Sequence, residues 1–263
     1  MPRFALVLSY DGSRFDGWQT QPSGTTVQDQ LECALACIAG HPVPSVCAGR
    51  TDAGVHALRQ VIHFDSDASR PDTAWVRGVN SHLPEGIAVR HAIRVDESFH
   101  ARFGATARRY RYLLHVSPIR HPLLCGRAGW THHTLDIDAM RQAATLLEGE
   151  HDFSAFRSAQ CQAASPVRRL ESLVISGQGP LIQFQVTGNA FLHHMVRNLV
   201  GLLVDIGCGR HGPTFAAEVL AGRDRRQAPA TFDASGLYLE GVRYDARFAL
   251  PSWAGESMAE WLV

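Results

Sequence analysis

The sequence is organised around a glycine-flanked stretch in its first quarter, Cys47-Ala48-Gly49-Arg50-Thr51-Asp52-Ala53-Gly54-Val55-His56-Ala57. Asp52 lies between two glycines, which can adopt positive φ and leave room for a ligand to approach the backbone. Arg50 and Asp52 share one face if the segment is extended. A plain turn is the alternative interpretation, because Asp and Gly are common turn residues. The stretch therefore indicates either a turn or a carboxylate presented to a ligand.

The segments around this stretch predict an α+β fold. Apolar runs indicate strands, and Thr26 is a good cap for a helix with an apolar face that ends before Gly40. The expected elements are a strand over 4–9, a helix over 26–38, strands near 45–48 and over 60–64, a helix over 72–83 and a strand over 87–94. This β-α-β-β-α-β order is that of ferredoxin-like and RRM-like folds.

The second half of the chain repeats this order of elements. Tyr110, Tyr112, Leu114 and Val116 alternate with polar residues, as expected for a half-buried strand. The expected elements are a strand over 107–116, a helix over 136–148, a hairpin of strands 170–175 and 181–186, helices over 192–206 and 214–221, and a strand over 237–244. We predict an N-terminal half over 1–104, a C-terminal half over 105–250 and a tail over 251–263.

The composition is that of a globular protein without excess charge. Of the 263 residues, 45% are hydrophobic and 19% are charged, and 25 basic residues balance 25 acidic ones. All basic residues are arginine, so an anion site has to use arginine or backbone NH groups. Local arginine clusters are the candidate contacts to nucleic-acid phosphates. They are Arg108/Arg109/Arg111, Arg168/Arg169 and Arg223/Arg225/Arg226.

Metal, disulfide and membrane signals are weak. The six cysteines show no C-x-x-C pair and no zinc or disulfide spacing. Two adjacent pairs, His132-His133 and His193-His194, are expected to point apart on a strand or by about 100° on a helix, so no metal site is expected. Met1 leads directly into an apolar strand, and no run of about 18 apolar residues follows. We therefore expect a cytoplasmic protein without a membrane span.

Arg197 is a charged residue at the start of an otherwise apolar predicted helix. A buried arginine needs an anion, because an unpaired charge in the interior is costly. The anion is either a structural partner or Asp52, whose ionised form the arginine would then stabilise. Chemistry at Asp52 requires three segments to meet, namely the loop of Asp52, the strand of Tyr110 and the helix start at 191–198.

Six motifs, spread in order from residue 10 to about 244, make the chain resemble the tRNA pseudouridine synthase A family. They are Tyr10-Asp11-Gly12…Phe15…Gly17-Trp18-Gln19…Gln21, Gly49-Arg50-Thr51-Asp52-Ala53-Gly54-Val55-His56-Ala57, Phe99-His100-Ala101-Arg102-Phe103…Ala107-Arg108-Arg109-Tyr110-Arg111-Tyr112, Gly149…His151-Asp152-Phe153…Phe156-Arg157, Phe191-Leu192-His193-His194-Met195-Val196-Arg197 and Gly236-Leu237-Tyr238-Leu239. No single motif is decisive, but together they are highly specific.

The resemblance implies a tRNA pseudouridine synthase that isomerises uridine at positions 38, 39 and 40 of the anticodon stem-loop. It implies a homodimer that needs no metal or organic cofactor. By position, Asp52 is the catalytic aspartate, Tyr110 stacks on the target base and Arg197 pairs with Asp52. Arg50 helps to displace the base, and Leu237 contributes to substrate binding.

The resemblance also implies the pseudouridine synthase fold. In this α+β fold, two ferredoxin/RRM-like halves join into one mixed, mainly antiparallel sheet flanked by helices, with the catalytic cleft between the halves. The RNA backbone is then expected to contact arginines of two of the clusters. These arginines are Arg108, Arg109, Arg111, Arg168 and Arg169.

The residue types fit an isomerisation, and two mechanisms stay open. Asp52 could attack C1′ of the target nucleotide, or it could remove the 2′ proton to give a glycal. Tyr110 could stack on the uracil and relay the C5 proton. One rival class is a non-catalytic RNA-binding or tRNA-folding module, whose function survives loss of Asp52. A second rival is a nucleoside hydrolase, which needs another carboxylate near Asp52, with Asp11 and Asp16 as the candidates.

Overall fold

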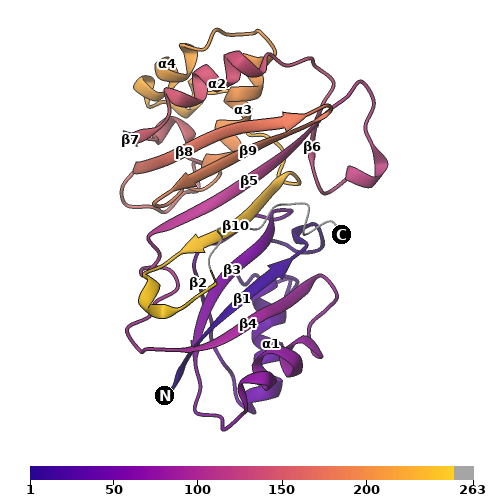
Figure 1. Cartoon of the computed structure of the whole chain (residues 1–263), viewed down its shortest axis with the longest axis vertical. Helices are drawn as coiled ribbons and strands as arrows, with labels where there is room; N and C mark the ends of the chain where they lie inside the picture. Colours follow the sequence, from indigo (N-terminus) through magenta and orange to yellow (C-terminus); the bar gives the residue numbers. More distant parts are fainter. Residues whose placement is uncertain (252–263) are drawn as a thin grey trace. The chain divides into compact units, whose positions relative to one another are not determined.

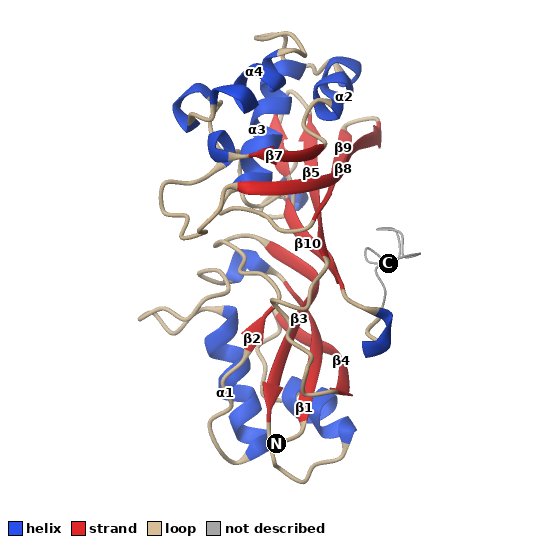
Figure 2. Ribbon diagram, turned by 90° about the vertical axis from the view of Figure 1, so that its left-hand side faces the viewer, coloured by secondary structure: helices blue, strands red, loops and turns tan. Residues whose placement is uncertain are grey.

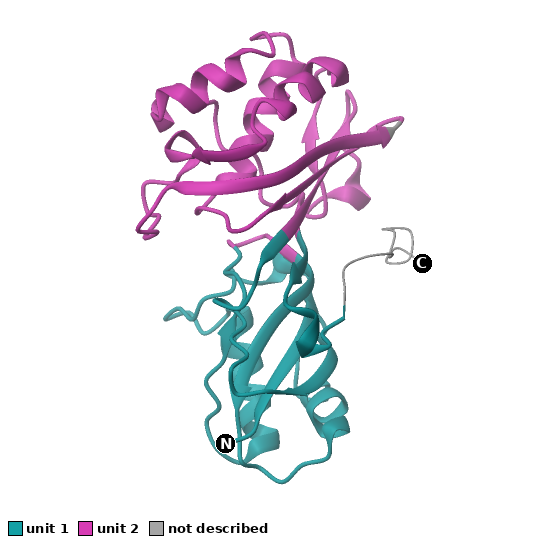
Figure 3. Cartoon of the chain, turned by 60° about the vertical axis from the view of Figure 1, so that its left-hand side comes forward, with its two compact units in different colours: residues 1–51, 57–108, 239–263 teal, residues 52–56, 109–238 magenta. Residues whose placement is uncertain are grey.

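The computed structural model describes residues 1–251, and the chain forms two compact units (Figure 3). Of the described residues, the first unit contains 1–51, 57–108 and 239–251, and the second contains 52–56 and 109–238. Asp52 therefore belongs to the second unit, although the segments on both sides of its loop belong to the first. The tail predicted over 251–263 lies outside the described residues, except for Pro251.

The first unit is built on three antiparallel strands, β1 (Arg3–Tyr10), β3 (His56–Asp65) and β4 (Ile87–Val95) (Figure 2). β1 pairs with both of the others, and Leu6 lies opposite Ile62 of β3 and Ala92 of β4. The short strand β2 (Val46–Cys47) adds to β3 directly before the loop that carries Asp52. The strands predicted for this half are therefore present, and β3 is longer than expected.

Local signals set the bounds of helix α1 (Val27–Ala39) as predicted. The Thr26 hydroxyl accepts from the Asp29 backbone NH, and the Asp29 carboxylate accepts from the Thr26 backbone NH, which forms a capping box. Gly40 ends the helix in the left-handed region at φ 82°. The helix predicted over 72–83 is shorter, with a π-helical segment η2 (Ala74–Gly78) at its centre. Trp75 of η2 is fully buried, with its ring 5.0 Å from that of Phe64.

In the second unit, three helices lie together beside a strand group (Figure 1). The strands are β5 (Ala107–Val116), β6 (Gly129–Thr131), β7 (Gly149–Asp152), β8 (Val167–Gln178) and β9 (Leu181–Gly188). The helices are α2 (Ile137–Thr145), α3 (Met195–Gly207) and α4 (Phe215–Gly222). The hairpin predicted between β8 and β9 is present, and the short strands β6 and β7 were not predicted.

The hydrogen-bonded strand order is β4-β1-β3-β10-β5-β9-β8-β7, with β10 spanning Leu237–Arg243. The pairs β1–β3, β1–β4, β7–β8 and β8–β9 are antiparallel, whereas β5–β6 is parallel. The predicted α+β class with a large, mainly antiparallel sheet is therefore confirmed. Among the described residues, no helix is long and apolar enough to cross a membrane.

Helix α3 begins three residues later than the predicted start at Leu192. His194 is its N-terminal cap residue and has a left-handed backbone at φ 63°, which a helix interior does not allow. The Met195 backbone NH instead closes a turn onto the Leu192 carbonyl at 3.0 Å. His193 and His194 therefore lie in this turn and not in the regular helix.

Candidate active site

Asp52 lies in a tight turn of the second unit. The Val55 backbone NH donates to the Asp52 carbonyl oxygen at 3.1 Å. Gly54 has φ 79°, a conformation that glycine adopts at little cost, and a Cβ there would lie 3.4 Å from that of Ala234. The Asp52 side chain is 21% exposed, so its carboxylate is partly shielded but still accessible. The stretch is thus both a turn and a platform for one carboxylate.

Three side chains from the start of α3 surround the Asp52 carboxylate. The Arg197 guanidinium donates to Oδ2 at 3.0 Å. His194 Nε2 lies 3.3 Å from the same oxygen, and His193 Nε2 lies 3.1 Å from Oδ1. Arg197 therefore forms an ion pair with Asp52, as predicted from the resemblance. The guanidinium and His194 contact Oδ2, and His193 contacts Oδ1.

A loop that precedes β10 holds Arg197 in position. Arg197 Nε donates to the Phe232 carbonyl at 2.9 Å, and the Phe232 backbone NH donates back to the Arg197 carbonyl at 3.2 Å. Gly201, one turn later, lies so close to this loop that a Cβ would collide with the Ala230 carbonyl oxygen. The guanidinium is thus fixed from two sides, with 16% of its side chain exposed.

Asn198 connects the same loop to the rest of the unit. Its amide donates to the Phe156 carbonyl at 2.7 Å, and its Oδ1 accepts from Thr231 Oγ1 at 2.6 Å and from Arg225 at 3.2 Å. The residue is 1% exposed, so these bonds satisfy a buried amide. The network orients the residue next to Arg197 and limits movement of the helix start.

The expectation that His193 and His194 point apart is wrong. Their ring centroids are 4.0 Å apart, and both rings face Asp52. The expectation assumed regular helix or strand geometry, whereas His194 is a left-handed residue in the turn before α3. The rings of His132 and His133 are also 4.0 Å apart, so the expectation is wrong for that pair too. Burial lowers the pKa of His194, and the nearby Asp52 carboxylate opposes this shift. The neutral imidazole of His194 is therefore favoured near neutral pH.

Tyr110 lies on β5 and is 8% exposed. Its ring meets Phe191 edge to face, with centroids 5.1 Å apart and an interplanar angle of 84°. Phe191 is two residues before His193, so this contact joins the strand of Tyr110 to the segment that reaches Asp52. Tyr112 is fully buried and donates to the Asp233 carbonyl at 2.9 Å, which supports the loop that holds Arg197.

The other predicted substrate residues differ in exposure. Leu237 begins β10, is 5% exposed, and its backbone NH donates to the Ala234 carbonyl at 2.9 Å. Arg50 is exposed and belongs to the first unit. His56, which the motif also contains, places Nε2 2.9 Å from the Gly126 carbonyl and 3.2 Å from that of Ser235. His56 is therefore a buried connector of two loops.

The arginines predicted to meet RNA phosphates have unequal surroundings. Arg108 is 9% exposed, and its guanidinium donates to the carbonyls of Ala48, Arg102 and Ala105. Arg109 and Arg111 are half-buried and donate to side chains of β9, namely Thr187 at 3.3 Å and Gln183 at 2.9 Å. Arg168 is half-buried, and Arg169 is exposed.

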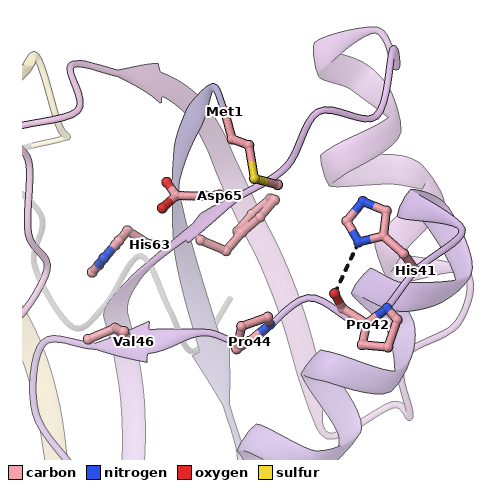
Figure 4. A pocket seen from close by; sticks show the side chains of 8 residues that line it. Met1, His41, Pro42, Pro44, Val46, His63 and Asp65 are labelled. Carbon is pink, nitrogen blue, oxygen red and sulfur yellow. Dashed lines mark hydrogen bonds between the residues drawn. The ribbon is translucent and has the colours of Figure 1, made fainter.

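A shallow pocket of about 300 Å³ lies within the first unit (Figure 4). It is lined by Met1, His41, Pro42, Pro44, Val46, His63, Phe64 and Asp65. Asp65 is bound to Arg3 at 2.8 Å, and burial lowers the pKa of His63 to about 4. None of the predicted site residues lines this pocket.

Sequence comparison assigns the chain to a family. The chain matches the tRNA pseudouridine synthase family over its residues 6–104 and 143–245. Proteins named tRNA pseudouridine synthase A from Aromatoleum aromaticum and Neisseria meningitidis are each 56% identical to it, over 95% of this chain and 94% and 97% of theirs. The protein of that name from Paraburkholderia xenovorans is 55% identical, over 96% of this chain and 93% of its own.

This chain therefore belongs to the tRNA pseudouridine synthase family. The resemblance found in the sequence motifs is confirmed, and the protein is an enzyme of the isomerase class. Among solved structures, the crystal structure of a Cbf5-Nop10-Gar1 complex aligns with 88% of this chain and 47% of that chain, at 12% identity and a TM-score of 0.39.

Proposed function

We propose that this protein isomerises uridine to pseudouridine at positions 38, 39 and 40 in the anticodon arm of tRNA, with Asp52 as the catalytic group. One observation carries the proposal. In the family motif of a confirmed family member, a single partly exposed carboxylate is held by a fixed guanidinium, with Arg197 3.0 Å from Asp52 Oδ2. Either open mechanism uses this carboxylate, and the guanidinium holds it in one orientation.

The reaction makes limited demands on the protein. The N1–C1′ bond of uridine breaks, the freed uracil turns, and C1′ bonds to C5, whose proton is then lost while N1 gains one. Nothing is oxidised, reduced or hydrolysed overall. Asp52 either bonds to C1′ and later leaves, or takes the 2′ proton and later returns it. Because Arg197 and His194 occupy Oδ2, we assign the reacting role to Oδ1, which only His193 approaches among the contacts described above.

The target base has to leave its stack before it reaches Asp52. Unstacking costs a few kcal/mol, and an aromatic face in the site can offset part of it. We assign this stacking to Tyr110, whose ring is supported edge to face by Phe191. Arg50 helps to displace the base, and Leu237 provides an apolar contact to it.

Phosphate contacts are assigned to the arginines whose guanidinium groups can reach solvent. Arg169 is exposed, and Arg109, Arg111 and Arg168 are half-buried. The three carbonyls that Arg108 binds occupy its guanidinium inside the protein, which supports a structural contribution for this residue. The enzyme is proposed to act in the cytoplasm, as a homodimer and without a metal or organic cofactor.

The test is the pseudouridine content of an unmodified tRNA transcript that bears uridine at 38, 39 and 40. Wild-type protein is expected to convert these uridines, and Asp52→Asn and Asp52→Ala to convert none while still binding the RNA. Asp138→Asn is the matched control, because its carboxylate is 82% exposed on α2. Binding without conversion by the wild type would instead favour a tRNA-folding module, and release of free uracil a hydrolase.

A further inference from the structure

The start of α3 gathers three potential metal ligands on one side. Asp52, His193 and His194 each offer one ligand atom, and these atoms all lie within 4.8 Å of one another. All three residues belong to the second unit and are partly exposed, with side chains that are 21%, 35% and 28% accessible. A small ion can therefore enter from solvent and meet all three donors.

The separations fit a small tetrahedral ion. Zinc binds nitrogen and oxygen ligands at about 2.0–2.2 Å, which places neighbouring ligand atoms about 3.3–3.5 Å apart. His193 Nε2 lies 3.1 Å from Asp52 Oδ1, and His194 Nε2 lies 3.3 Å from Asp52 Oδ2. The segment that carries the two histidines is anchored by two hydrogen bonds. The His193 carbonyl accepts from the Ser158 backbone NH at 3.0 Å, and the Asn198 side-chain amide donates to the Phe156 carbonyl at 2.7 Å. These bonds keep the segment that carries the two histidines next to Asp52.

We propose that Asp52, His193 and His194 form a zinc site that inhibits the enzyme reversibly. Two imidazoles and one carboxylate suit zinc and similar transition metals, whereas magnesium prefers oxygen ligands alone. One carboxylate oxygen of Asp52 and one ring nitrogen of each histidine supply three ligands, and water takes the fourth position. When a ring nitrogen binds the metal, its proton moves to Nδ1 through solvent.

The neighbouring Arg197 limits the affinity of this site. Its guanidinium binds Asp52 Oδ2 at 3.0 Å and compensates the carboxylate charge that would otherwise attract a dication. Oδ1 remains available to the metal. The site therefore releases zinc when a chelator competes, and this is the basis of a reversible inhibition rather than of a permanent structural site. Inhibition rests on the proposed role of Asp52, but binding does not.

Metal binding is tested directly on the protein without RNA. The exposed cysteines 33, 37 and 125 are first replaced by serine in every protein, because they could bind zinc elsewhere. Zinc affinity is then measured by competition with a chromophoric chelator. His193→Asn, His194→Asn and Asp52→Asn are each expected to weaken binding by about tenfold or more. Asparagine tolerates the left-handed backbone of residue 194, so folding is preserved.

A second histidine pair serves as the matched control. His132 and His133 are also adjacent, with ring centroids 4.0 Å apart, and neither is part of the group that surrounds Asp52. The double variant His132→Asn/His133→Asn is expected to keep wild-type zinc affinity. Equal affinity of the wild type and the three site variants would overturn the proposal.

Cobalt reports the ligand set without any substitution in the site. Bound to the proposed donors, cobalt chloride is expected to give the visible absorption of a four-coordinate nitrogen and oxygen site. Cys161 lies close, since its sulfur accepts from the His193 backbone NH at 3.5 Å. A near-ultraviolet thiolate band would show that this cysteine binds the metal, and would contradict the proposed ligand set.

Inhibition is measured as pseudouridine formation while zinc chloride is added at constant magnesium. The expected midpoint equals that of zinc binding, activity returns with EDTA, and extra magnesium at the same concentration has no effect. Zinc binding at Asp52 with full activity would refute the inhibitory part. If the metal-free wild type forms no pseudouridine, the proposed function fails, while the binding result stands by itself.

Discussion

The Arg197 guanidinium reaches Asp52 with a side chain that is only 16% exposed, so the ion pair is partly removed from water. Loss of this partner leaves the carboxylate near two imidazoles but without a fixed cation. Arg197→Met is therefore expected to lower kcat by about 100-fold, the effect typical of removing one preorganised charge partner. The measurement is single-turnover pseudouridine formation with saturating enzyme.

An exposed ion pair of the same composition provides the comparison. Arg141 binds Asp138 at 3.0 Å on α2, with side chains that are 50% and 82% exposed. Such pairs contribute little, so Arg141→Met is expected to leave kcat within about twofold of wild type. Equal losses in both variants would mean that the effect of Arg197→Met is not specific to Asp52.

His63 of β3 gives the stability of the protein a defined pH dependence. Its Nδ1 accepts from the Ala101 backbone NH at 3.1 Å, and burial lowers its pKa from 6.5 to about 4. The unfolded chain therefore binds a proton before the folded one does. The resulting stability is complete above pH 6.5 and is lost as the pH falls toward 4, by up to about 3 kcal/mol.

His63→Asn keeps an acceptor for the Ala101 NH but cannot be protonated. Urea unfolding at pH 7 and pH 5 is expected to show a smaller loss of stability at the lower pH for this variant than for wild type. His82→Asn, on an exposed histidine of the same unit, is the control and should follow wild type. Parallel pH profiles for wild type and His63→Asn would refute this assignment.

At the scale of single elements, helix α3 and the loop before β10 act as one support for the site. A Cβ at Gly201 would collide with the Ala230 carbonyl oxygen, and this loop also supplies the Phe232 carbonyl that holds Arg197. Gly201→Ala is expected to cost about 1–3 kcal/mol of stability by overpacking. Displacement of the loop should also lower kcat under conditions where the variant is still folded.

Gly212→Ala separates this local collision from a general effect of added methyl groups. A Cβ at Gly212 meets no atom within 4 Å, so stability and kcat should both remain near wild type. Thermal unfolding and pseudouridine formation are measured on the same preparations. If Gly201→Ala retains wild-type kcat, the loop does not position Arg197.

The sequence predicted those elements whose signals are local. Helix α1 has its capping box and its terminal glycine within its own residues, and its bounds agree with the prediction. Strands β6 and β7 are short and depend on pairing with β5 and β8, so no local pattern marks them. The direction of the two histidines before α3 was also beyond prediction, because both face Asp52, a residue far away in the sequence.

At the scale of the whole molecule, a chain of zero net charge is proposed to bind a polyanion. The overall charge then provides no attraction, so binding has to depend on a few arginines that neutralise phosphates. The counterions that the RNA releases on binding make the affinity salt-dependent. Association with RNA does not require Asp52 to be catalytic. The salt dependence of tRNA affinity is therefore a separate measure of the RNA surface.

Arg169 is the exposed member of the arginines assigned to phosphate. Arg169→Ala is expected to weaken tRNA binding and to reduce the slope of log affinity against log salt by about one. Arg77, exposed on η2 of the first unit, is the matched control, and Arg77→Ala should leave the slope unchanged. Filter binding at five salt concentrations measures both. If Arg169 contacts a phosphate, binding by the Arg169→Ala variant releases fewer counterions and the slope falls. An unchanged slope would show that Arg169 is not part of the RNA-binding surface.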